Sequence, residues 1–211
     1  MELNDPLIRT GHPPNPPKLK RSASLFPRLF LRIILVIVIS TLSIHLPVFT
    51  VKTPNREQTF KEITGILERY SKDLDNVTRI ELAEAIYEES VRYNQDPKFI
   101  LALIAIESSF QNQSVSEKGA KGLMQLMPYV AEAIAPQLNI EWHGEGMLFD
   151  PLINIKLGSY YLNQLIRDFK HLELALVAYN YGPTYVKSRI ERKEHIPLGY
   201  CRRVISLYQN L

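Results

Sequence analysis

FILALIAIESSF, residues 99–110, decides the fold class. Its apolar residues do not alternate with polar ones, and they cover almost the whole circumference of a helix, which indicates a helix buried on most sides. The one carboxylate, Glu107, lies on the same face as Ile104 and Leu103. Burial on that face would raise the pKa of Glu107 and favour the protonated form that a general acid needs. The alternative is that Glu107 turns to solvent in the last turn of its helix.

Two helix-start signals lie on either side of this segment. The dipeptide Asp-Pro occurs at 96–97 and again at 150–151. Each pairs an N-cap acceptor with a proline at the first helical position. They predict one helix that contains the buried segment and a second, long helix that runs to about Lys170.

The remaining pattern is also helical. Thr78 and Glu81 have the spacing of a capping box. Further helices are expected over residues 60–70, 79–93 and 172–181, with up to two more after Gly182-Pro183. A short hairpin near 139–147 is the one β element considered. The predicted fold class is therefore all-α.

A polar loop with two glycines follows the buried helix. SEKGAKGLMQLMP, residues 116–128, predicts a turn and then a helix that begins with Leu123. Glycine permits positive φ and close backbone approach. The turn would bring Ser116 and Gln125 back towards Glu107, where a hydroxyl and an amide could act as hydrogen-bond partners.

Each of these features also has a plain structural explanation. A glycine loop between helices can be only a connector, and Met124 and Met127 can be core residues. Tyr179 and Asn180 end the helix predicted over 172–181, where they face a cleft or are half-buried.

Taken together, four segments resemble the motifs of the soluble lytic transglycosylase (SLT) family. They are ESxF from Glu107, SxxGAxGLMQLMP from Ser116, DPxxNIxxGxxYL from Asp150 and ALxAYNxGP from Ala175. They occur in the family's order but cover less than half of the chain. Tyr181 stands where the family often has alanine. The segment at Tyr200 resembles the family's terminal motif only loosely, so Tyr200 is not assigned to the site.

The resemblance implies a lysozyme-like helical domain of the goose-lysozyme/SLT type that acts on peptidoglycan. Glu107 would protonate the oxygen between N-acetylmuramic acid and N-acetylglucosamine. It would then act as base while the muramyl C6 hydroxyl attacks C1 to give a 1,6-anhydro product. No cofactor or metal is implied. The carried-over residues are Glu107 as the catalytic group and, for substrate binding, Ser116, Met124, Gln125, Met127, Tyr179 and Asn180.

Two other functions remain open. A hydrolase similar to goose-type lysozyme would need a second carboxylate to activate water. Glu117, Glu141, Glu145 and Asp150 are candidates by position. A catalytically idle wall-binding or secretion-apparatus module is the other alternative, and the intact Glu107 argues against it.

The N-terminal quarter has a different composition. Residues 1–28 form a basic, proline-rich tail, and residues 29–51 are almost wholly apolar and reach the ~20 residues that a bilayer span needs. A cleaved signal peptide is the competitor, but no A-x-A-like site follows. We therefore expect a single-pass anchor in a bacterial inner membrane, a lead-in over 57–96 that packs on the domain, and a periplasmic domain over 97–211.

Charge and cysteine content restrict the partners. Residues 1–56 carry eight Lys/Arg and two Asp/Glu, whereas residues 57–211 carry seventeen and twenty. The folded part thus gives no electrostatic reason to expect nucleic acid. The lone Cys201 forbids an internal disulfide. The expected partners are peptidoglycan strands, the membrane and, as a further candidate, an envelope or secretion machine.

Overall fold

The computed structural model describes residues 55–70 and 79–211. The basic tail, the expected membrane anchor at 29–51 and the capping residue Thr78 lie outside these ranges. Within them, no helix combines the length and the apolarity required to cross a bilayer.

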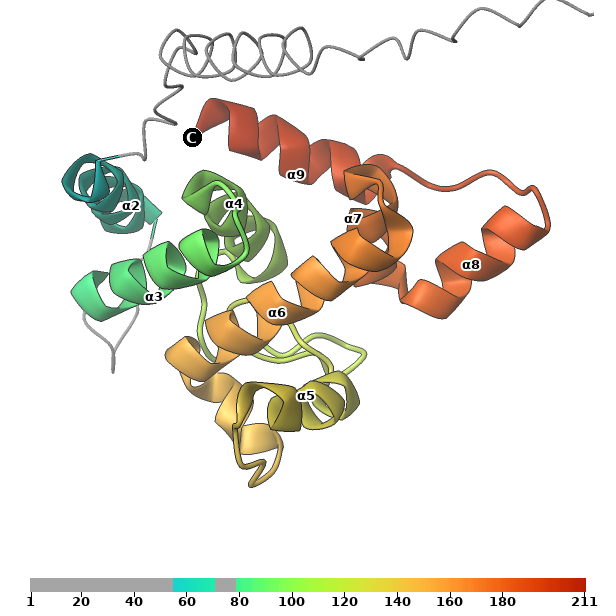
Figure 1. Ribbon diagram of the computed structural model, residues 1–211, viewed down its shortest axis with the longest axis horizontal. Coiled ribbons are helices and arrows are strands. Elements are labelled where there is room, and N and C mark those ends of the chain that lie inside the picture. The colour runs from blue at the N-terminus through green and yellow to red at the C-terminus, as the bar shows by residue number, and fades with distance from the viewer. Residues whose placement is uncertain (1–54, 71–78) are drawn as a thin grey trace, which may run out of the picture. The chain divides into compact units, whose positions relative to one another are not determined.

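The described part of the chain is helical and contains no β-strand (Figure 1). Two isolated bridges link Lys121 to Val115 and to Leu126. The all-α prediction is confirmed. The helices are α2 (Arg56–Tyr70), α3 (Arg79–Arg92), α4 (Pro97–Ser108), α5 (Pro128–Ile134), the 3-10 helices η1 (Ala135–Leu138) and η2 (Glu145–Phe149), α6 (Pro151–Phe169), α7 (Leu172–Tyr181), α8 (Pro183–Glu191) and α9 (Gly199–Asn210).

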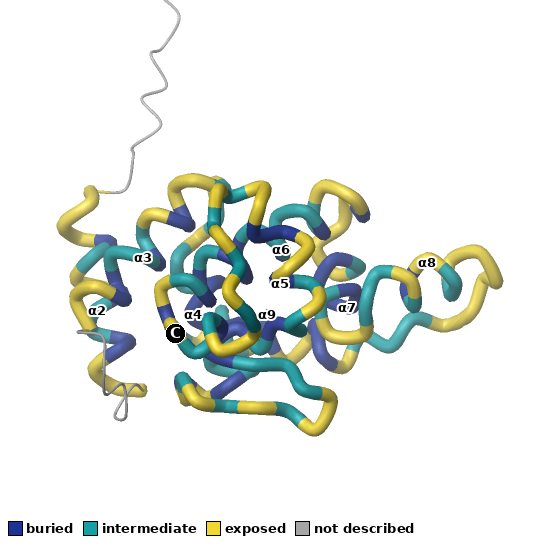
Figure 2. Tube along the Cα trace, turned by 90° about the horizontal axis from the view of Figure 1, so that it is seen from below, coloured by how far each residue is buried: buried dark blue, intermediate teal, exposed yellow. Residues whose placement is uncertain are grey.

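Helix α4 forms the centre of the main hydrophobic core. Residues 99–104 are all buried, which explains why apolar residues occupy every side of this helix. It packs against α2, α3 and α9. Figure 2 shows that this central region is buried, whereas α8 is mostly exposed or half-buried.

A second, smaller core lies beside the first. It is formed by apolar residues of α5, η1, η2 and α6, together with Leu126. Tyr161 of α6 and Tyr179 of α7 pack against both cores. The loop between α4 and α5 contributes Met124 to the first core and Leu126 to the second, so it runs along their boundary.

The predicted helix starts are confirmed. The Asp96 carboxylate accepts a hydrogen bond from the backbone N–H of Lys98 at 2.8 Å, at the start of α4. Asp150 caps α6 in the same way and accepts from the N–H groups of Leu152 and Ile153 at 2.9 and 3.1 Å. These caps satisfy donors that have no partner within the helix.

Two other local predictions are wrong. The helix expected to begin with Leu123 begins at Pro128, because Gly122 and Gln125 have φ values of 80° and 49°, in the left-handed region that cannot continue an α-helix. The hairpin considered near 139–147 does not form, and that segment leads into η2 instead.

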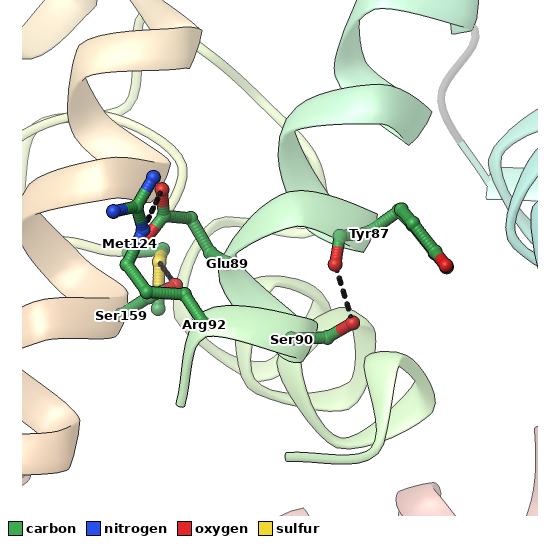
Figure 3. A network of polar contacts seen from close by, with 6 residues as sticks. All are labelled: Tyr87, Glu89, Ser90, Arg92, Met124 and Ser159. Carbon is green, nitrogen blue, oxygen red and sulfur yellow. Dashed lines mark hydrogen bonds and ion pairs between the residues drawn. The ribbon is translucent and has the colours of Figure 1, made fainter. Parts of the chain in front are cut away.

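Figure 3 shows polar contacts within α3 and between α6 and the loop that follows α4. The buried Glu89 accepts from Nε of Arg92 at 3.2 Å, and burial raises the pKa of Glu89 while Arg92 opposes the rise. Ser159 of α6 donates to the Met124 sulfur at 3.9 Å. The loop after α4 is therefore held against α6 at Met124.

Candidate active site

Glu107 lies in the last turn of α4, which ends at Ser108. Ser109 and Phe110 have φ values of 53° and 63°, and two successive left-handed residues break the helix. The side chain of Glu107 lines a cavity of about 400 Å³. That volume falls within the range of about 300–1,000 Å³ that is typical of small-molecule sites. The cavity is lined by Glu107, Ser116, Glu117, Lys118, Ala120, Gln125, Met127, Tyr179 and Asn180.

The surroundings of Glu107 favour its neutral form. Burial raises the pKa of Glu107 to about 7, while the Tyr200 hydrogen bond and the charge of Arg203 oppose the rise. Desolvation prevails over both, so a large fraction of Glu107 carries a proton at neutral pH. The raised pKa expected from the sequence is confirmed.

Tyr200 is the site residue that the sequence pattern missed. Its hydroxyl donates to Oε1 of Glu107, although the two residues are 93 positions apart in the chain. Helix α9 carries Tyr200 and packs directly on α4. Burial and the neighbouring Glu107 raise the pKa of Tyr200, so the phenol remains a donor. No local signal marks this contact, since it depends on how two distant helices pack.

The loop of residues 114–126 is closed by its own hydrogen bonds. The Ser116 hydroxyl accepts from the N–H of Ala120 at 3.0 Å. The Gln125 amide donates to the carbonyl groups of Ser114 and Gly122 at 3.0 and 2.9 Å. Ser116 and Gln125 line the Glu107 cavity, but their hydrogen bonds maintain the shape of the loop that forms its wall.

Asn154 fixes this loop to α6. Its Oδ1 accepts from the N–H of Met124 at 2.7 Å, and its Nδ2 donates to the carbonyl groups of Lys121 and Leu148 at 3.0 and 2.9 Å. Asn154 is fully buried. Gly122 passes so close that an added Cβ would lie 2.2 Å from the Leu148 carbonyl oxygen, which explains the glycine there.

A hydrogen bond joins Tyr179, which lines the cavity, to the backbone at Met124. The Tyr179 hydroxyl donates to the backbone carbonyl of Met124 at 2.8 Å. The resemblance assigns Met124 to substrate binding. Its side chain is instead fully buried against Gly158 and does not line the cavity. The other predicted site residues all line the cavity, namely Glu107, Ser116, Gln125, Met127, Tyr179 and Asn180.

The four acids considered as a second carboxylate lie in different surroundings. Glu117 lines the Glu107 cavity. Asp150 caps α6. The Glu145 carboxylate lies 3.7 Å from Nζ of Lys121, and the Glu141 carboxylate lies 3.8 Å from Nε2 of His143. Within residues 55–70 and 79–211, no group of three His, Cys, Asp or Glu side chains could hold a metal ion.

Residues 84–197, more than half of the chain, match the family model of the transglycosylase SLT domain. The chain belongs to this family. The match includes Glu107 and the whole lining of its cavity, but Tyr200 lies just beyond it.

Curated relatives match the SLT domain of this chain. Membrane-bound lytic murein transglycosylase E of Buchnera aphidicola is 36% identical over 95 residues, which are 42% of this chain and 45% of that protein. The soluble lytic murein transglycosylase of Salmonella typhimurium is 34% identical over 92 residues, 43% of this chain and 14% of that protein. The matched region thus spans less than half the length of each relative.

The fold of the SLT domain has a counterpart among solved structures. The 70 kDa soluble lytic transglycosylase of Escherichia coli superposes with a TM-score of 0.54 and 20% identity, over 72% of this chain and 28% of that one. This likeness supports the predicted lysozyme-like helical fold.

Proposed function

We propose that this protein is a peptidoglycan lytic transglycosylase. It cleaves the β-1,4 bond between N-acetylmuramic acid and N-acetylglucosamine and leaves a 1,6-anhydromuramyl end. The observation that carries the proposal is the state of Glu107, a buried carboxyl group with a pKa of about 7 at the wall of an open cavity. Such a group is matched to donate a proton near neutral pH and then to take one back.

The proposed reaction needs one carboxyl group. Glu107 gives its proton to the glycosidic oxygen as the bond from that oxygen to muramyl C1 breaks. The Glu107 carboxylate then takes the proton of the C6 hydroxyl as O6 bonds to C1, which restores the acid. Tyr200 donates to Oε1 throughout and is proposed to orient the carboxyl group and to stabilise its ionised form.

The remaining residues divide into two roles. Ser116, Gln125, Met127 and Asn180 line the cavity and are proposed to contact the sugar. Met124, assigned to substrate binding by resemblance, is instead proposed to position Tyr179 through its backbone carbonyl.

A muramidase that hydrolyses the same bond is the alternative. It requires a second carboxylate near the reacting carbon to activate water. Glu117 is the candidate, because it shares the cavity with Glu107. Glu117 is exposed, so packing does not fix its carboxylate at one position over the sugar.

The product distinguishes the two reactions. We expect the full-length protein, purified in mild detergent, to release muropeptides with 1,6-anhydromuramyl ends from purified peptidoglycan, because no water need enter the reaction. Mass spectrometry of the digest provides the measurement. Reducing muramic acid as the sole end group would refute the lyase and favour the muramidase.

We further propose that residues 29–51 anchor the protein in the inner membrane with the SLT domain in the periplasm. The apolar run and the basic residues that precede it support this topology. The expected result is that the full-length protein remains with the membrane after a carbonate wash, and that a C-terminal tag is accessible to protease only once the outer membrane is opened. A mature protein that begins near Val51 and washes off would contradict the anchor.

A further inference from the structure

Helix α9 carries a second residue that bears on Glu107. Arg203 lies three positions after Tyr200, and residues with this spacing share one face of a helix. The guanidinium carbon of Arg203 lies 5.9 Å from the centroid of the Tyr200 ring, within the range of a cation–π contact. We propose that Arg203 is a positioning residue for the reaction, which holds the Tyr200 phenol against Glu107 and sets the pH range in which Glu107 acts.

This inference rests on the proposed function, because it concerns the group that would donate the proton. Arg203 belongs to none of the motifs that resemble the family, and it lies beyond residues 84–197, which match the family model. It does not line the Glu107 cavity either. Arg203 is therefore expected to act on the acid from outside the cavity, without touching the sugar.

The contact with Tyr200 is the first step of the argument. The Tyr200 ring is buried, and its hydroxyl donates to Oε1 of Glu107. A cation over an aromatic face is attracted to the ring and polarises it, so it holds the phenol in place and makes it a stronger donor. Burial and Glu107 raise the pKa of Tyr200, and the charge of Arg203 opposes this rise. Arg203 thus strengthens the hydrogen bond that orients the acid.

The charge of Arg203 also acts on Glu107 directly. Burial raises the pKa of Glu107, whereas the Tyr200 hydrogen bond and the Arg203 charge lower it. Of the cations in residues 55–70 and 79–211, Arg203 alone has this effect. Helices α2 and α3 also pack on α4, but they contribute no charge that shifts the pKa of Glu107.

The other groups that face Glu107 do not replace this cation. Helix α7 contributes Tyr179, whose phenol is neutral because burial raises its pKa well above the ordinary value. The loop after α4 contributes Glu117 and Lys118 to the cavity wall, and neither shifts the pKa of Glu107. The Arg203 charge is therefore the electrostatic control on this acid.

No neighbouring carboxylate neutralises Arg203. In the part of the chain that the structure describes, Arg203 forms no ion pair with Asp or Glu. Its side chain is exposed, so a substitution there leaves the core intact. The preceding residue, Arg202, is also exposed, but its charge acts on Cys201 and not on Glu107. Arg202 therefore offers a matched control on the same helix.

A cation at this place has a defined consequence for the reaction. Glu107 gives its proton to the glycosidic oxygen, and the charge of Arg203 stabilises the carboxylate that forms. Without Arg203 the pKa of Glu107 would rise further, so the carboxyl group would donate its proton less readily. The pH above which the free enzyme has lost this proton would rise as well.

The pH dependence of kcat/KM tests the proposal, because its high-pH limb reports the pKa of Glu107 in the free enzyme. The full-length proteins, in mild detergent, are compared on soluble, uncross-linked peptidoglycan strands. Arg203→Gln is expected to move this limb upward by roughly 0.5 pH unit, the size expected for an exposed charge pair. Arg203→Lys keeps the charge and is expected to keep the limb. Arg202→Gln is the control and is also expected to keep it.

A double-mutant cycle of Arg203→Gln and Glu107→Gln measures the same interaction without substrate. The equilibrium constants for unfolding of the four full-length proteins are compared by denaturant titration at pH 4 and pH 8. Glu107 is neutral at pH 4 and mostly ionised at pH 8, because its pKa is about 7. We expect a favourable coupling of about two- to fivefold in this constant at pH 8, and none at pH 4.

Each outcome decides the proposal. An unmoved limb in Arg203→Gln, or an equal shift in Arg203→Lys or Arg202→Gln, would overturn it. A higher KM with an unmoved limb would place Arg203 against the substrate, and equal coupling at both pH values would show a merely structural contact. Either result would also overturn the proposal.

The proposed function is judged separately, by the end groups that the wild-type protein releases. Reducing ends together with a pH-dependent coupling would reject the lyase alone. Anhydro ends without such a coupling would reject the role of Arg203 alone.

Discussion

Replacing Glu107 with glutamine is expected to lower the release of anhydro products by at least about 10²- to 10⁴-fold, the usual contribution of general acid–base catalysis. Glutamine keeps the shape of the side chain and can still accept the hydrogen bond from Tyr200, but it cannot transfer a proton. The measurement is the initial rate of product release from purified peptidoglycan by the full-length proteins. A Glu107→Gln protein with full activity would refute the assignment of Glu107.

The same variant is expected to change how stability depends on pH. The folded-state pKa of Glu107, about 7, lies above its ordinary value of 4.5. Below pH 4.5, Glu107 is protonated in both the folded and the unfolded protein. Between pH 4.5 and about 7, the unfolded protein loses this proton and the folded protein keeps it. Wild-type protein therefore loses on the order of 3 kcal/mol of unfolding free energy relative to Glu107→Gln as the pH rises to about 7. Chemical denaturation of both proteins at pH 4 and pH 8 measures this difference.

Two variants serve as comparisons for Glu107→Gln. Glu132→Gln makes the same chemical change on an exposed residue of α5 and is expected to leave activity unaltered. Glu117→Gln tests the muramidase, which would need Glu117 as a base. The lyase predicts at most a small loss for Glu117→Gln, and a loss as large as that of Glu107→Gln would favour the hydrolase.

The second large effect is expected at Asn154. Asn154→Ala removes three hydrogen bonds and leaves the N–H of Met124 and the carbonyl group of Leu148 without this partner, whereas the Lys121 carbonyl still accepts from the N–H of Leu126. Because a net hydrogen bond contributes about 1 kcal/mol and a buried unsatisfied group costs more, we expect the unfolding free energy to fall by about 3 kcal/mol. Activity is also expected to fall, since Met124 positions Tyr179. Denaturant titration at pH 5 provides the measurement.

Two further substitutions on α6 serve as controls for Asn154→Ala. Asn163→Ala removes a partly exposed asparagine from the same helix and is expected to change stability by less than about 0.5 kcal/mol. Asn154→Asp keeps the acceptor for Met124 but places a carboxylate oxygen against two carbonyl groups, so it is expected to destabilise at least as much as Asn154→Ala. Equal stability of Asn154→Ala and wild type would show that the loop does not depend on this anchor.

Features with a local cause could be predicted from the sequence. Asp96 and Asp150 mark helix starts because an N-cap acts within three residues. Glu107 is recognisable because it continues the apolar face of its own helix, and that face predicts burial. The left-handed conformation of Gln125 was not predictable, because asparagine and glycine, not glutamine, usually adopt it and the surrounding loop imposes it here. Tyr200 was missed for a related reason, since only the packing of α9 on α4 brings it to Glu107.

The contact between Tyr200 and Glu107 also makes the state of the acid depend on a helix that is distant from it in the sequence. A contact that joins residues 93 positions apart is among those that a folding chain acquires slowly, because a large loop must close first. Helix α9 supplies both groups that oppose the rise of the Glu107 pKa, the hydroxyl of Tyr200 and the charge of Arg203. The proton affinity of Glu107 is therefore set only once α9 has packed on α4.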